Sequence, residues 1–248
     1  TFKRYPEGVE KDFFFEKRCP GHRPAWVKTA AIAQDNGEPL TFCVVNDLET
    51  LIWAENLASI ELHTPLAKAQ APNTPDAMIF DLDPGEGAGL PECSRVALIL
   101  RDLLAGLGLA SYGKTSGRKG LHVYVPLNRP ETSFEDTRAF SRAVAEIMQN
   151  HYPKLVTAKM AKQERKAKVF INWSQNDAAK TMISVYSLRA REKPFVSFPV
   201  EWETVESVVN FGGAESLNVM HAEAVRRIMK KGDLFRDVLV KVQRLPHL

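Results

Sequence analysis

The stretch Phe80-Asp81-Leu82-Asp83-Pro84-Gly85 decides the fold of this chain. It continues the apolar residues 77–79, and together they have the composition of a strand that ends at a turn. Because side chains alternate between the two faces of a strand, every second residue from Met78 is expected to face a core. Asp81 and Asp83 then lie next to each other on the opposite face.

Two adjacent carboxylates repel each other unless positive charge lies between them. A hard divalent cation bound by oxygen ligands is the usual partner, so the pair indicates a metal site. Pro84 and Gly85 end the strand directly after the pair and leave it near solvent. Two solvated carboxylates on an edge strand are the alternative, and a D-x-D pattern alone favours that alternative.

The composition is that of a soluble globular protein. The chain has 248 residues, of which 44% are hydrophobic and 25% are charged, and both values are ordinary. No apolar run is long enough to span a bilayer, and residues 1–6 lack the apolar core of a signal peptide. We predict one domain over residues 1–248 and no membrane partner.

The three cysteines, Cys19, Cys43 and Cys93, are odd in number and scattered along the chain. This usage predicts reduced thiols and a cytoplasmic protein rather than a disulfide framework. Cys19 and His22 have a spacing that occurs in metal sites, but no second pair lies nearby. A surface thiol in a loop is therefore the favoured interpretation.

Basic residues concentrate in one part of the chain. The net charge is +3, but residues 154–193 contain ten Lys or Arg against three acidic residues, a local charge of +7. The rest of the chain therefore sums to −4 (3 − 7). A basic zone on a nearly neutral chain indicates a polyanionic partner, and a solvated, lysine-rich helix face is the alternative.

Strand and helix patterns alternate irregularly, which predicts an α+β fold. Helices are expected after Asp47, over residues 91–107, and after Ser133, where Asp136 completes a capping-box pattern. Strands are expected over 168–173 and, as the neighbour of that strand, over 181–186.

Two helices are expected to close the chain. The apolar spacing predicts that the first buries Ala222, Val225 and Met229. The second is expected to begin at Asp233 and to bury Phe235, Val238, Leu239 and Val242.

The turn Ser116-Gly117-Arg118-Lys119-Gly120 is rich in backbone N–H groups and carries a hydroxyl and two cations. Such a loop can bind a phosphate, although it lacks the spacing of a Walker A loop and precedes a strand. An ordinary hairpin turn is the alternative. His122 follows directly on the polar face of the next strand, where a structural histidine is the more common occurrence.

Other candidate residues lie far from this turn in the sequence. Arg189 follows a strand pattern, and its guanidinium can bind phosphate oxygens through two hydrogen bonds. Phe13, Phe14 and Phe15 cannot all point inward, so at least one is expected to be exposed and available to stack on a base beside Lys17. A carboxylate pair, a phosphate-binding turn, a basic zone and a free aromatic ring together indicate phosphoryl or nucleotidyl transfer with two metal ions.

These residues resemble the polymerase domain of bacterial ligase D and its stand-alone archaeal and bacterial relatives. That family belongs to the archaeo-eukaryotic primase superfamily and serves non-homologous end joining. The resemblance spans nearly the whole chain in the family's order. The matching stretches are Phe13-Phe14-Phe15-Glu16-Lys17, Glu61-Leu62-His63, Phe80-Asp81-Leu82-Asp83-Pro84-Gly85-Glu86-Gly87, Thr115-Ser116-Gly117-Arg118-Lys119-Gly120-Leu121-His122, Val169-Phe170-Ile171-Asn172-Trp173-Ser174-Gln175-Asn176 and Tyr186-Ser187-Leu188-Arg189.

The resemblance implies a fold and a role for each candidate residue. The fold is the primase catalytic fold, with an RRM-like sheet beside a second sheet across the active cleft and flanking helices. The implied roles are two metal ions, Mn²⁺ or Mg²⁺, on Asp81 and Asp83; triphosphate binding by Ser116, Lys119, His122 and Arg189; base stacking on Phe15 with Lys17 close by; selection of ribonucleotides by His63 and Gln175; and a pocket also lined by Lys3 and Arg165.

The chain departs from the family pattern at two places. Asn172 stands where the family has an Asp that completes the catalytic metal site. A neutral amide is expected to weaken the catalytic metal and to spare nucleotide binding. The family also has a further N-terminal segment with lysines near the DNA 5′-phosphate, and the start at Thr1 predicts a weaker grip on a phosphorylated end.

The resulting prediction is an end-joining polymerase or primase that adds nucleotides, preferably ribonucleotides, to DNA 3′ ends. Asn172 is expected to reduce its activity, so a catalytically silent module that binds nucleotides or DNA ends is the alternative. A metal-dependent phosphohydrolase fits the acidic pair but leaves Phe15 and Arg189 unexplained. The implied partners are broken or gapped DNA at the nucleoid and nucleoside triphosphates. The sequence does not decide whether Ku is a partner or whether a ligase domain is attached.

Overall fold

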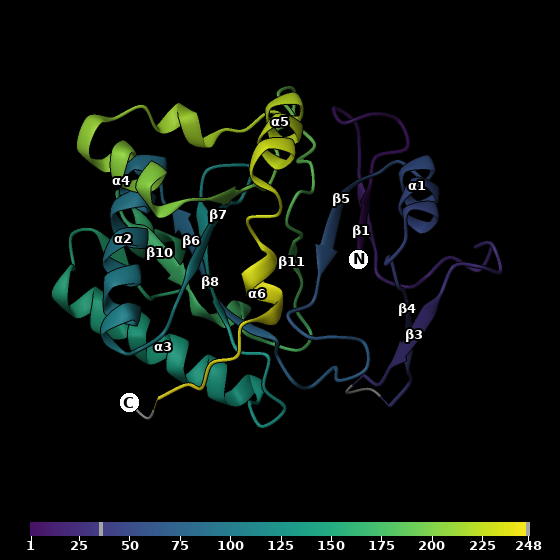
Figure 1. The fold of residues 1–248 in the computed structure, drawn as a ribbon, viewed down its shortest axis with the longest axis horizontal. Helices are drawn as coiled ribbons and strands as arrows, with labels where there is room; N and C mark the ends of the chain where they lie inside the picture. The colour runs from purple at the N-terminus through teal and green to yellow at the C-terminus, as the bar shows by residue number, and fades with distance from the viewer. Residues whose placement is uncertain (35–36, 247–248) are drawn as a thin grey trace.

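A computed structural model describes residues 1–34 and 37–246. The described chain has an α+β architecture with a six-stranded sheet, a four-stranded sheet and a two-stranded hairpin. Figure 1 shows the larger sheet with α2, α3 and α4 on one side of the molecule and the smaller sheet with α1 on the other. The predicted fold class is therefore confirmed.

The six-stranded sheet contains the acidic stretch on a central strand. Its order is β12-β7-β8-β6-β10-β9, and every pair is antiparallel except β10 with β9. The strands are β6 (Ala77–Pro84), β7 (Tyr112–Thr115), β8 (Leu121–Pro126), β9 (Val156–Thr157), β10 (Val169–Asn172) and β12 (Pro199–Val200). Since β6 pairs with a neighbour on each side, the edge-strand alternative for Asp81 and Asp83 is wrong.

Four of these strands and two helices form the RRM-like unit that the resemblance implies. The chain runs β6, α2 (Leu90–Gly106), β7, β8, α3 (Phe134–His151), β10, and the sheet order of the four strands is β7-β8-β6-β10. Met78, Phe80 and Leu82 are fully buried in the main apolar core together with residues of α2 and α3. The alternation of β6 therefore leaves Asp81 and Asp83 on the opposite face.

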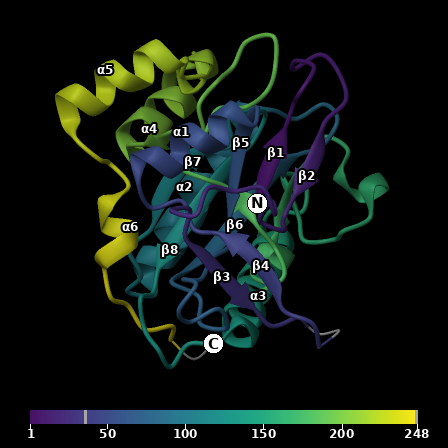
Figure 2. The same cartoon turned by 90° about the vertical axis from the view of Figure 1, so that its right-hand side faces the viewer.

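The four-stranded sheet has the order β11-β5-β1-β2, and Figure 2 shows β1, β2 and β5 side by side, with the β3–β4 hairpin next to them. Its strands are β1 (Phe2–Arg4), β2 (Phe14–Glu16), β5 (Ser59–Thr64) and β11 (Met182–Ile183); the hairpin contains β3 (Thr29–Ile32) and β4 (Leu40–Cys43), and α1 (Leu48–Asn56) leads into β5. The predicted pairing of residues 181–186 with 168–173 is wrong, because β11 pairs with β5 of the smaller sheet.

Two of the three cysteines form a disulfide. Cys19 and Cys43 are bonded, with 5.0 Å between their Cα atoms, whereas Cys93 is a buried free thiol. The Cys19 amide donates to the carbonyl of Thr41 at 2.7 Å, which places the loop after β2 beside β4. The prediction of three reduced thiols is therefore wrong, because a tertiary contact joins cysteines that are 24 residues apart.

Both predicted helix starts with a capping side chain are confirmed. The Asp47 carboxylate accepts from the amide of Thr50 at 2.8 Å. The Ser133 hydroxyl accepts from the Asp136 amide at 3.1 Å, and the Asp136 carboxylate accepts from the Ser133 amide at 2.9 Å. These bonds satisfy amide groups that the first turn of a helix leaves without a partner.

The C-terminal helices depart from their predicted packing. They are α4 (Trp202–Phe211), α5 (His221–Lys231) and α6 (Arg236–Val240); short 3₁₀ turns occupy Lys162–Arg165, Trp173–Gln175 and Ala214–Leu217. Ala224 is the buried residue of α5, and Ile228 packs with it against a small apolar cluster, so Val225 and Met229 face solvent. The periodic pattern identified the helix and missed its inward face by one residue.

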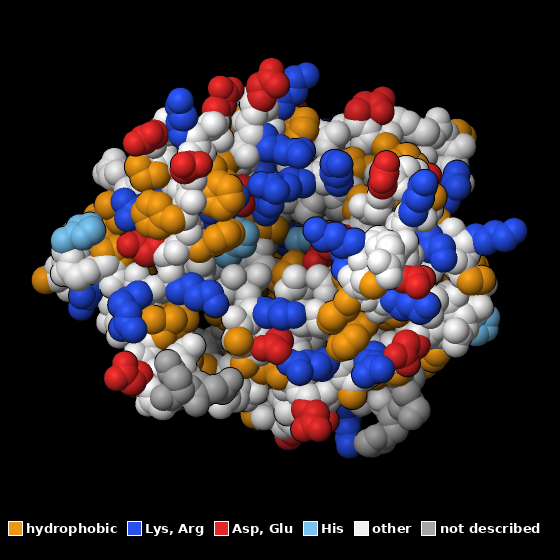
Figure 3. Space-filling model, turned by 180° about the vertical axis from the view of Figure 1, so that it is seen from behind, with side chains coloured by type: hydrophobic (Ala, Val, Ile, Leu, Met, Phe, Trp, Pro, Cys, Tyr) orange, Lys and Arg blue, Asp and Glu red, His pale blue; other side chains and the backbone are white. Residues whose placement is uncertain are grey.

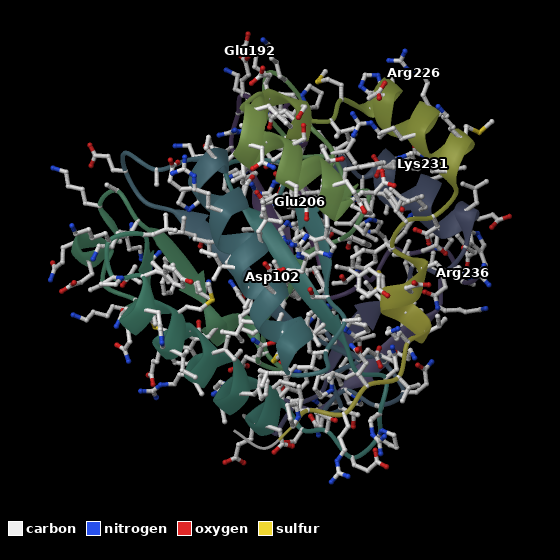
Figure 4. All side chains as sticks on the ribbon, turned by 60° about the vertical axis from the view of Figure 1, so that its left-hand side comes forward. Asp102, Glu192, Glu206, Arg226, Lys231 and Arg236 are labelled. Atoms are coloured by element: carbon white, nitrogen blue, oxygen red, sulfur yellow. A yellow bond between two sulfur atoms is a disulfide. The ribbon has the colours of Figure 1, made fainter. Side chains whose placement is uncertain are left out.

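The last helix begins at Arg236 rather than Asp233. The predicted burial of Phe235 and Val238 is confirmed, since both pack with Tyr124 of β8 in one apolar cluster, whereas Leu239 and Val242 are exposed. Figure 4 shows Arg236 at the start of this helix and, further up, Lys231 at the end of α5. No helix of the described residues is long and apolar enough to cross a membrane.

Charged side chains join α2 to α4 on the outside of the main core. Arg101 of α2 contacts Glu206 of α4 at 2.6 Å and Asp102 at 2.8 Å, and Figure 4 labels both carboxylates. All three side chains are partly exposed, so this network contributes little to stability. The network lies on the side of the larger sheet that α2 covers, opposite to the face that carries Asp81.

Candidate active site

The acidic strand lies between the two strands that carry the other predicted residues. In the sheet register, Asp81 is opposite His122 on β8 and opposite Asn172 on β10. Asp81 Oδ1 is 3.3 Å from His122 Nε2, and Asp81 Oδ2 accepts a hydrogen bond from Asn172 Nδ2 at 3.2 Å. Side chains from three strands that are separated in the sequence therefore lie next to one another.

The two carboxylates carry more negative charge than their surroundings neutralise. Burial, followed by the charge of Asp81, raises the pKa of Asp83 to about 7, and the nearby Arg165 only partly offsets this. His122 does not supply a positive charge, because burial and the neighbouring Lys114 lower its pKa to about 4. The site therefore favours an added cation.

The donor set fits a hard divalent cation only in part. Two carboxylates on one strand face are suitable oxygen ligands for Mn²⁺ or Mg²⁺. Within the described ranges 1–34 and 37–246, however, no group of three or more acidic, histidine or cysteine side chains is arranged to hold a metal. The remaining ligands of a cation on Asp81 and Asp83 would have to come from substrate and water.

Asn172 uses its amide as a hydrogen-bonding group. Its Nδ2 donates to Asp81, and its Oδ1 accepts from the Ser174 hydroxyl at 2.8 Å. Lys180 Nζ donates in turn to that hydroxyl at 2.9 Å. The amide oxygen at this position is already engaged, and the nitrogen that faces Asp81 cannot bind a cation.

The predicted phosphate-binding turn packs directly against the acidic strand. The Ser116 hydroxyl accepts from the amides of Arg118 and Gly120 at 3.2 and 3.1 Å, which holds the turn closed. A Cβ at Gly120 would lie 2.3 Å from the carbonyl oxygen of Leu82, so only glycine permits this approach. Lys119 is exposed at the turn.

Arg189 lies against the same turn. Gly117 has φ +67°, and a Cβ there would lie 2.6 Å from Arg189 Cγ. The Arg189 guanidinium is 3.4 Å from the carboxylate of Glu61, and its Nε has no hydrogen-bond partner in the described chain. The side chain is thus held at the turn with one buried donor unpaired.

Glu61 is a central residue of the site for which the sequence had predicted no role. Its carboxylate is fully buried and lies 3.6 Å from Lys3 Nζ, 3.5 Å from an Arg118 nitrogen and 3.4 Å from Arg189. Burial alone would raise the pKa of Glu61, but the hydrogen bond from His63 and the charges of Arg189 and Lys3 lower it to about 2. Three cations around one carboxylate leave two positive charges for an anionic ligand.

The aromatic residues of β2 complete this side of the site. Phe13, Phe14 and Phe15 are all about half exposed, so the prediction of at least one exposed ring is confirmed. The Phe15 ring meets the His63 ring edge to face at 5.6 Å. Lys3 Nζ lies 3.8 Å from the centre of the Phe13 ring.

Lys17 and His63 both line a cavity of about 860 Å³. The cavity lies between the β3–β4 hairpin, α1 and the end of β5. Lys17 Nζ donates to the carbonyl of Ala179, which also lines it, at 3.3 Å. Asp81 and Asp83 do not border this cavity, so it adjoins the smaller sheet and not the acidic strand.

Arg165 and Gln175 lie on the β10 side of the site. Arg165 stacks on the Phe170 ring at 3.8 Å and donates to the carbonyl of Met160 at 2.5 Å. A Cβ at Gly85 would overlap the Arg165 carbonyl oxygen at 1.8 Å, which fixes Arg165 beside the end of β6. Gln175 ends the 3₁₀ turn directly after Asn172.

Lys114 is a second residue that the sequence analysis missed. It is fully buried, and its Nζ donates to the carbonyl of Ile183 at 3.1 Å and to the Ser197 hydroxyl at 2.5 Å. Burial lowers the pKa of Lys114 to about 7. Because Ile183 belongs to β11, this lysine joins the larger sheet to the smaller one beneath the site.

The charge distribution is visible on the surface. Figure 3 shows Lys and Arg side chains around a hollow in the middle of one face, with histidine side chains inside it. Arg118 and Lys119 are exposed and contribute to the basic surface. A surface of this kind favours a polyanion.

The fold is that of a known polymerase domain. This chain superposes on the polymerase domain of Mycobacterium tuberculosis ligase D, solved in complex with DNA, with a TM-score of 0.87 and 34% sequence identity. The match covers 98% of this chain and 84% of the solved one. The same arrangement of sheets and helices is therefore present in both.

Residues 1–235 match the family model of the LigD primase-polymerase domain, and the chain belongs to this family. The multifunctional non-homologous end joining protein LigD of Mycolicibacterium smegmatis is 39% identical over 94% of the chain. The bifunctional LigD of Bacillus subtilis is 32% identical over 84%. The chain spans about a third of the length of these relatives, 30% and 33% respectively.

Proposed function

We propose that this chain adds nucleotides, preferably ribonucleotides, to DNA 3′ ends during end joining. The observation that carries the proposal is the convergence of Asp81, Asn172 and the Ser116 turn around one site. In the reaction, the 3′-hydroxyl forms a bond to the α-phosphorus of the nucleotide, and pyrophosphate leaves. The family membership supports an end-joining polymerase role.

The acidic and the basic residues of the site are proposed to have different roles. Asp81 and Asp83 would hold Mn²⁺ or Mg²⁺, which neutralises phosphate charge and activates the attacking hydroxyl when bound. Arg189, Lys119 and the Ser116 turn would bind the triphosphate through charge-assisted and backbone hydrogen bonds. Phe15 would stack on the base, because its ring is exposed beside His63.

Asn172 is proposed to limit the chemistry and not the binding of nucleotide. A carboxylate at this position would add a third acidic ligand beside Asp81, whereas the amide donates to Asp81 instead. The nucleotide-binding residues of β1, β2 and β5 lie on the other sheet and do not depend on Asn172. Low incorporation with retained nucleotide binding is the expected behaviour.

The proposed partners are DNA with gapped or broken ends and nucleoside triphosphates. The solved relative from M. tuberculosis is a complex with DNA, and the basic rim of this chain suits the same kind of ligand. Ku and a ligase domain are further partners to be tested, because the chain spans only about a third of its end-joining relatives.

Primer extension on a gapped, 5′-phosphorylated duplex tests the proposal. The chain and its Asn172→Asp form are compared with Mn²⁺ and with ribo- and deoxyribonucleotides. Incorporation with pyrophosphate release by Asn172→Asp, above that of the unaltered chain, is the expected result. Equal extension by both forms would refute the inhibitory role of Asn172.

The second candidate, a catalytically silent module that binds nucleotides or DNA ends, is favoured by the engaged amide of Asn172. Nucleotide binding without incorporation by either form would establish it. Release of free phosphate instead of pyrophosphate would favour a phosphohydrolase.

A further inference from the structure

Glu61 and His63 form a carboxylate–imidazole pair on the smaller sheet. They lie two residues apart on β5, so both side chains point to the same face of the smaller sheet. Glu61 Oε2 is 3.2 Å from His63 Nε2, and the same oxygen is 3.4 Å from Arg189. One carboxylate oxygen thus contacts both His63, which is proposed to lie near the sugar, and Arg189, which is proposed to bind phosphate.

The other oxygen of Glu61 is held by fixed donors. Glu61 Oε1 accepts from the Ala190 amide and from the Tyr5 hydroxyl, both at 3.2 Å. Lys3 and Arg118 approach the same oxygen at 3.6 and 3.5 Å. The orientation of the carboxylate is therefore set by contacts that do not involve His63.

The proton of His63 can be placed from these contacts. An ionised carboxylate only accepts hydrogen bonds, so the contact requires a proton on His63 Nε2. Burial lowers the pKa of His63 below its ordinary value of 6.5, and Arg189 adds to this effect although Glu61 opposes it, so the ring is neutral at pH 7. A neutral imidazole with a proton on Nε2 has an unprotonated Nδ1, which can only accept.

The position of the ring shows what could donate to Nδ1. His63 lines the cavity beside Lys17, and its ring meets Phe15, the proposed platform for the base. No hydrogen bond to Nδ1 occurs within the described parts of the chain. Phosphate and ring oxygens of a nucleotide only accept hydrogen bonds, so the donors that a nucleotide offers are its sugar hydroxyls and the amino group of its base.

We propose that Glu61 is a positioning residue that holds His63 in the Nε2-protonated form, so that Nδ1 accepts a hydrogen bond from the 2′-hydroxyl of a ribonucleotide. This inference rests on the proposed function of the site and explains how it would recognise ribose. Glu61 itself does not touch the nucleotide. It acts through the proton position of His63.

Glu61→Gln tests the role of the carboxylate with little change of shape. The Gln oxygen stays at the position held by Ala190 and Tyr5, so its NH₂ group faces His63 Nε2. Two N–H groups cannot face each other, and the His63 proton is expected to move to Nδ1. Nitrogen NMR of ¹⁵N-histidine in the free protein, assigned with His63→Ala, reads this change directly.

Nucleotide binding provides the second readout. ATP, 2′-deoxyATP and 3′-deoxyATP are titrated with Mn²⁺ onto the protein bound to a gapped duplex with a dideoxy-terminated primer. One hydrogen bond to the 2′-hydroxyl predicts a roughly three- to tenfold preference for ATP over 2′-deoxyATP. Glu61→Gln and His63→Ala are each expected to reduce that ratio towards one, and the double variant is expected to show no further reduction.

Arg118→Gln is the matched control. It removes a cation from the other oxygen of Glu61 and is 39% exposed, so the fold tolerates the change. It is expected to weaken ATP and 2′-deoxyATP by the same factor and to keep the ratio. Circular dichroism and thermal unfolding of each variant confirm that the compared proteins are folded.

The outcomes separate this inference from the proposed function. A proton on Nδ1 in the unaltered protein, a preference that depends on the 3′-hydroxyl, or a ratio that Glu61→Gln leaves unchanged would overturn the inference alone. Failure of every nucleotide to bind the unaltered protein would overturn the proposed function. The NMR result would still establish the proton position of His63.

Discussion

Two carboxylate centres, one on each sheet, have opposite charge imbalance. On the larger sheet, Asp81 and Asp83 lie beside a neutral His122 and a neutral Asn172, so negative charge is in excess. On the smaller sheet, Glu61 alone balances three cations, so positive charge is in excess. The first centre favours a metal ion and the second favours phosphate, which together are the two charged parts of a metal-bound nucleotide.

In the absence of metal, replacing one carboxylate at each centre should change the free energy of unfolding in opposite directions. Glu61→Gln leaves buried cations without a counter-ion and should lower the free energy of unfolding by about 3 kcal/mol. Asp83→Asn removes repulsion by Asp81 and should raise it by about 1 kcal/mol. Urea unfolding in the presence of a chelator measures both, and changes of the same sign would contradict the comparison.

The same pair should differ in pH dependence. The pKa of Glu61 is about 2 in the fold against an ordinary 4.5, so its contribution is present above pH 4.5 and is lost as pH falls towards 2. The pKa of Asp83 is about 7 against 3.8, so without metal its ionisation destabilises the fold as pH rises from about 4 to 7. The gain from Asp83→Asn should therefore be larger at pH 8 than at pH 4.

Restoring a third carboxylate should strengthen the metal centre alone. Asn172→Asp is expected to raise Mn²⁺ affinity by about 10- to 100-fold. Calorimetric titration of Mn²⁺ measures this effect in the absence of nucleotide. Gln175→Glu, which adds the same charge three residues later, is the control and should have a much smaller effect.

Removal of the stacking ring should affect the nucleotide and not the metal. Phe15→Ala is expected to weaken ATP binding by about tenfold, the usual effect of losing one stacked aromatic ring. Phe14→Ala is the matched control, because Phe14 alternates to the other face of β2 and lies 5.1 Å from Arg4. Equal losses in the two variants would exclude Phe15 as the platform.

An exposed ion pair provides a comparison for the effect of burial on the free energy of unfolding. Arg142 and Glu146 on α3 are 2.8 Å apart, and both side chains are at least half exposed. Glu146→Gln should change the free energy of unfolding by no more than about 0.5 kcal/mol. A loss as large as that of Glu61→Gln would show that burial does not explain the difference between the centres.

Local patterns predicted the elements of the site better than their partners. The alternation around Asp81, the cap at Asp47 and the capping box at Ser133 are confirmed, because each depends on neighbouring residues. The predictions for the pairing of β11, for the inward face of α5 and for the reduced state of Cys19 and Cys43 were wrong. Each of these depends on a contact with a distant part of the chain.

Glu61 and Lys114 could not be identified from local sequence, because a carboxylate and a lysine within strands usually face solvent. The one available signal for Glu61 was its place two residues before His63, which puts both side chains on the same face. Their burial appears only when the two sheets meet and remove both groups from water.

The sequence by itself determined that Asp81 and Asp83 share one face of a strand, since alternation is a property of the backbone. It also determined the α+β class and the family resemblance. Only the tertiary structure decided that Asn172 donates to Asp81 and that Glu61 balances Lys3, Arg118 and Arg189, because such contacts join strands far apart in the chain. The charge of each centre follows from which strands become neighbours.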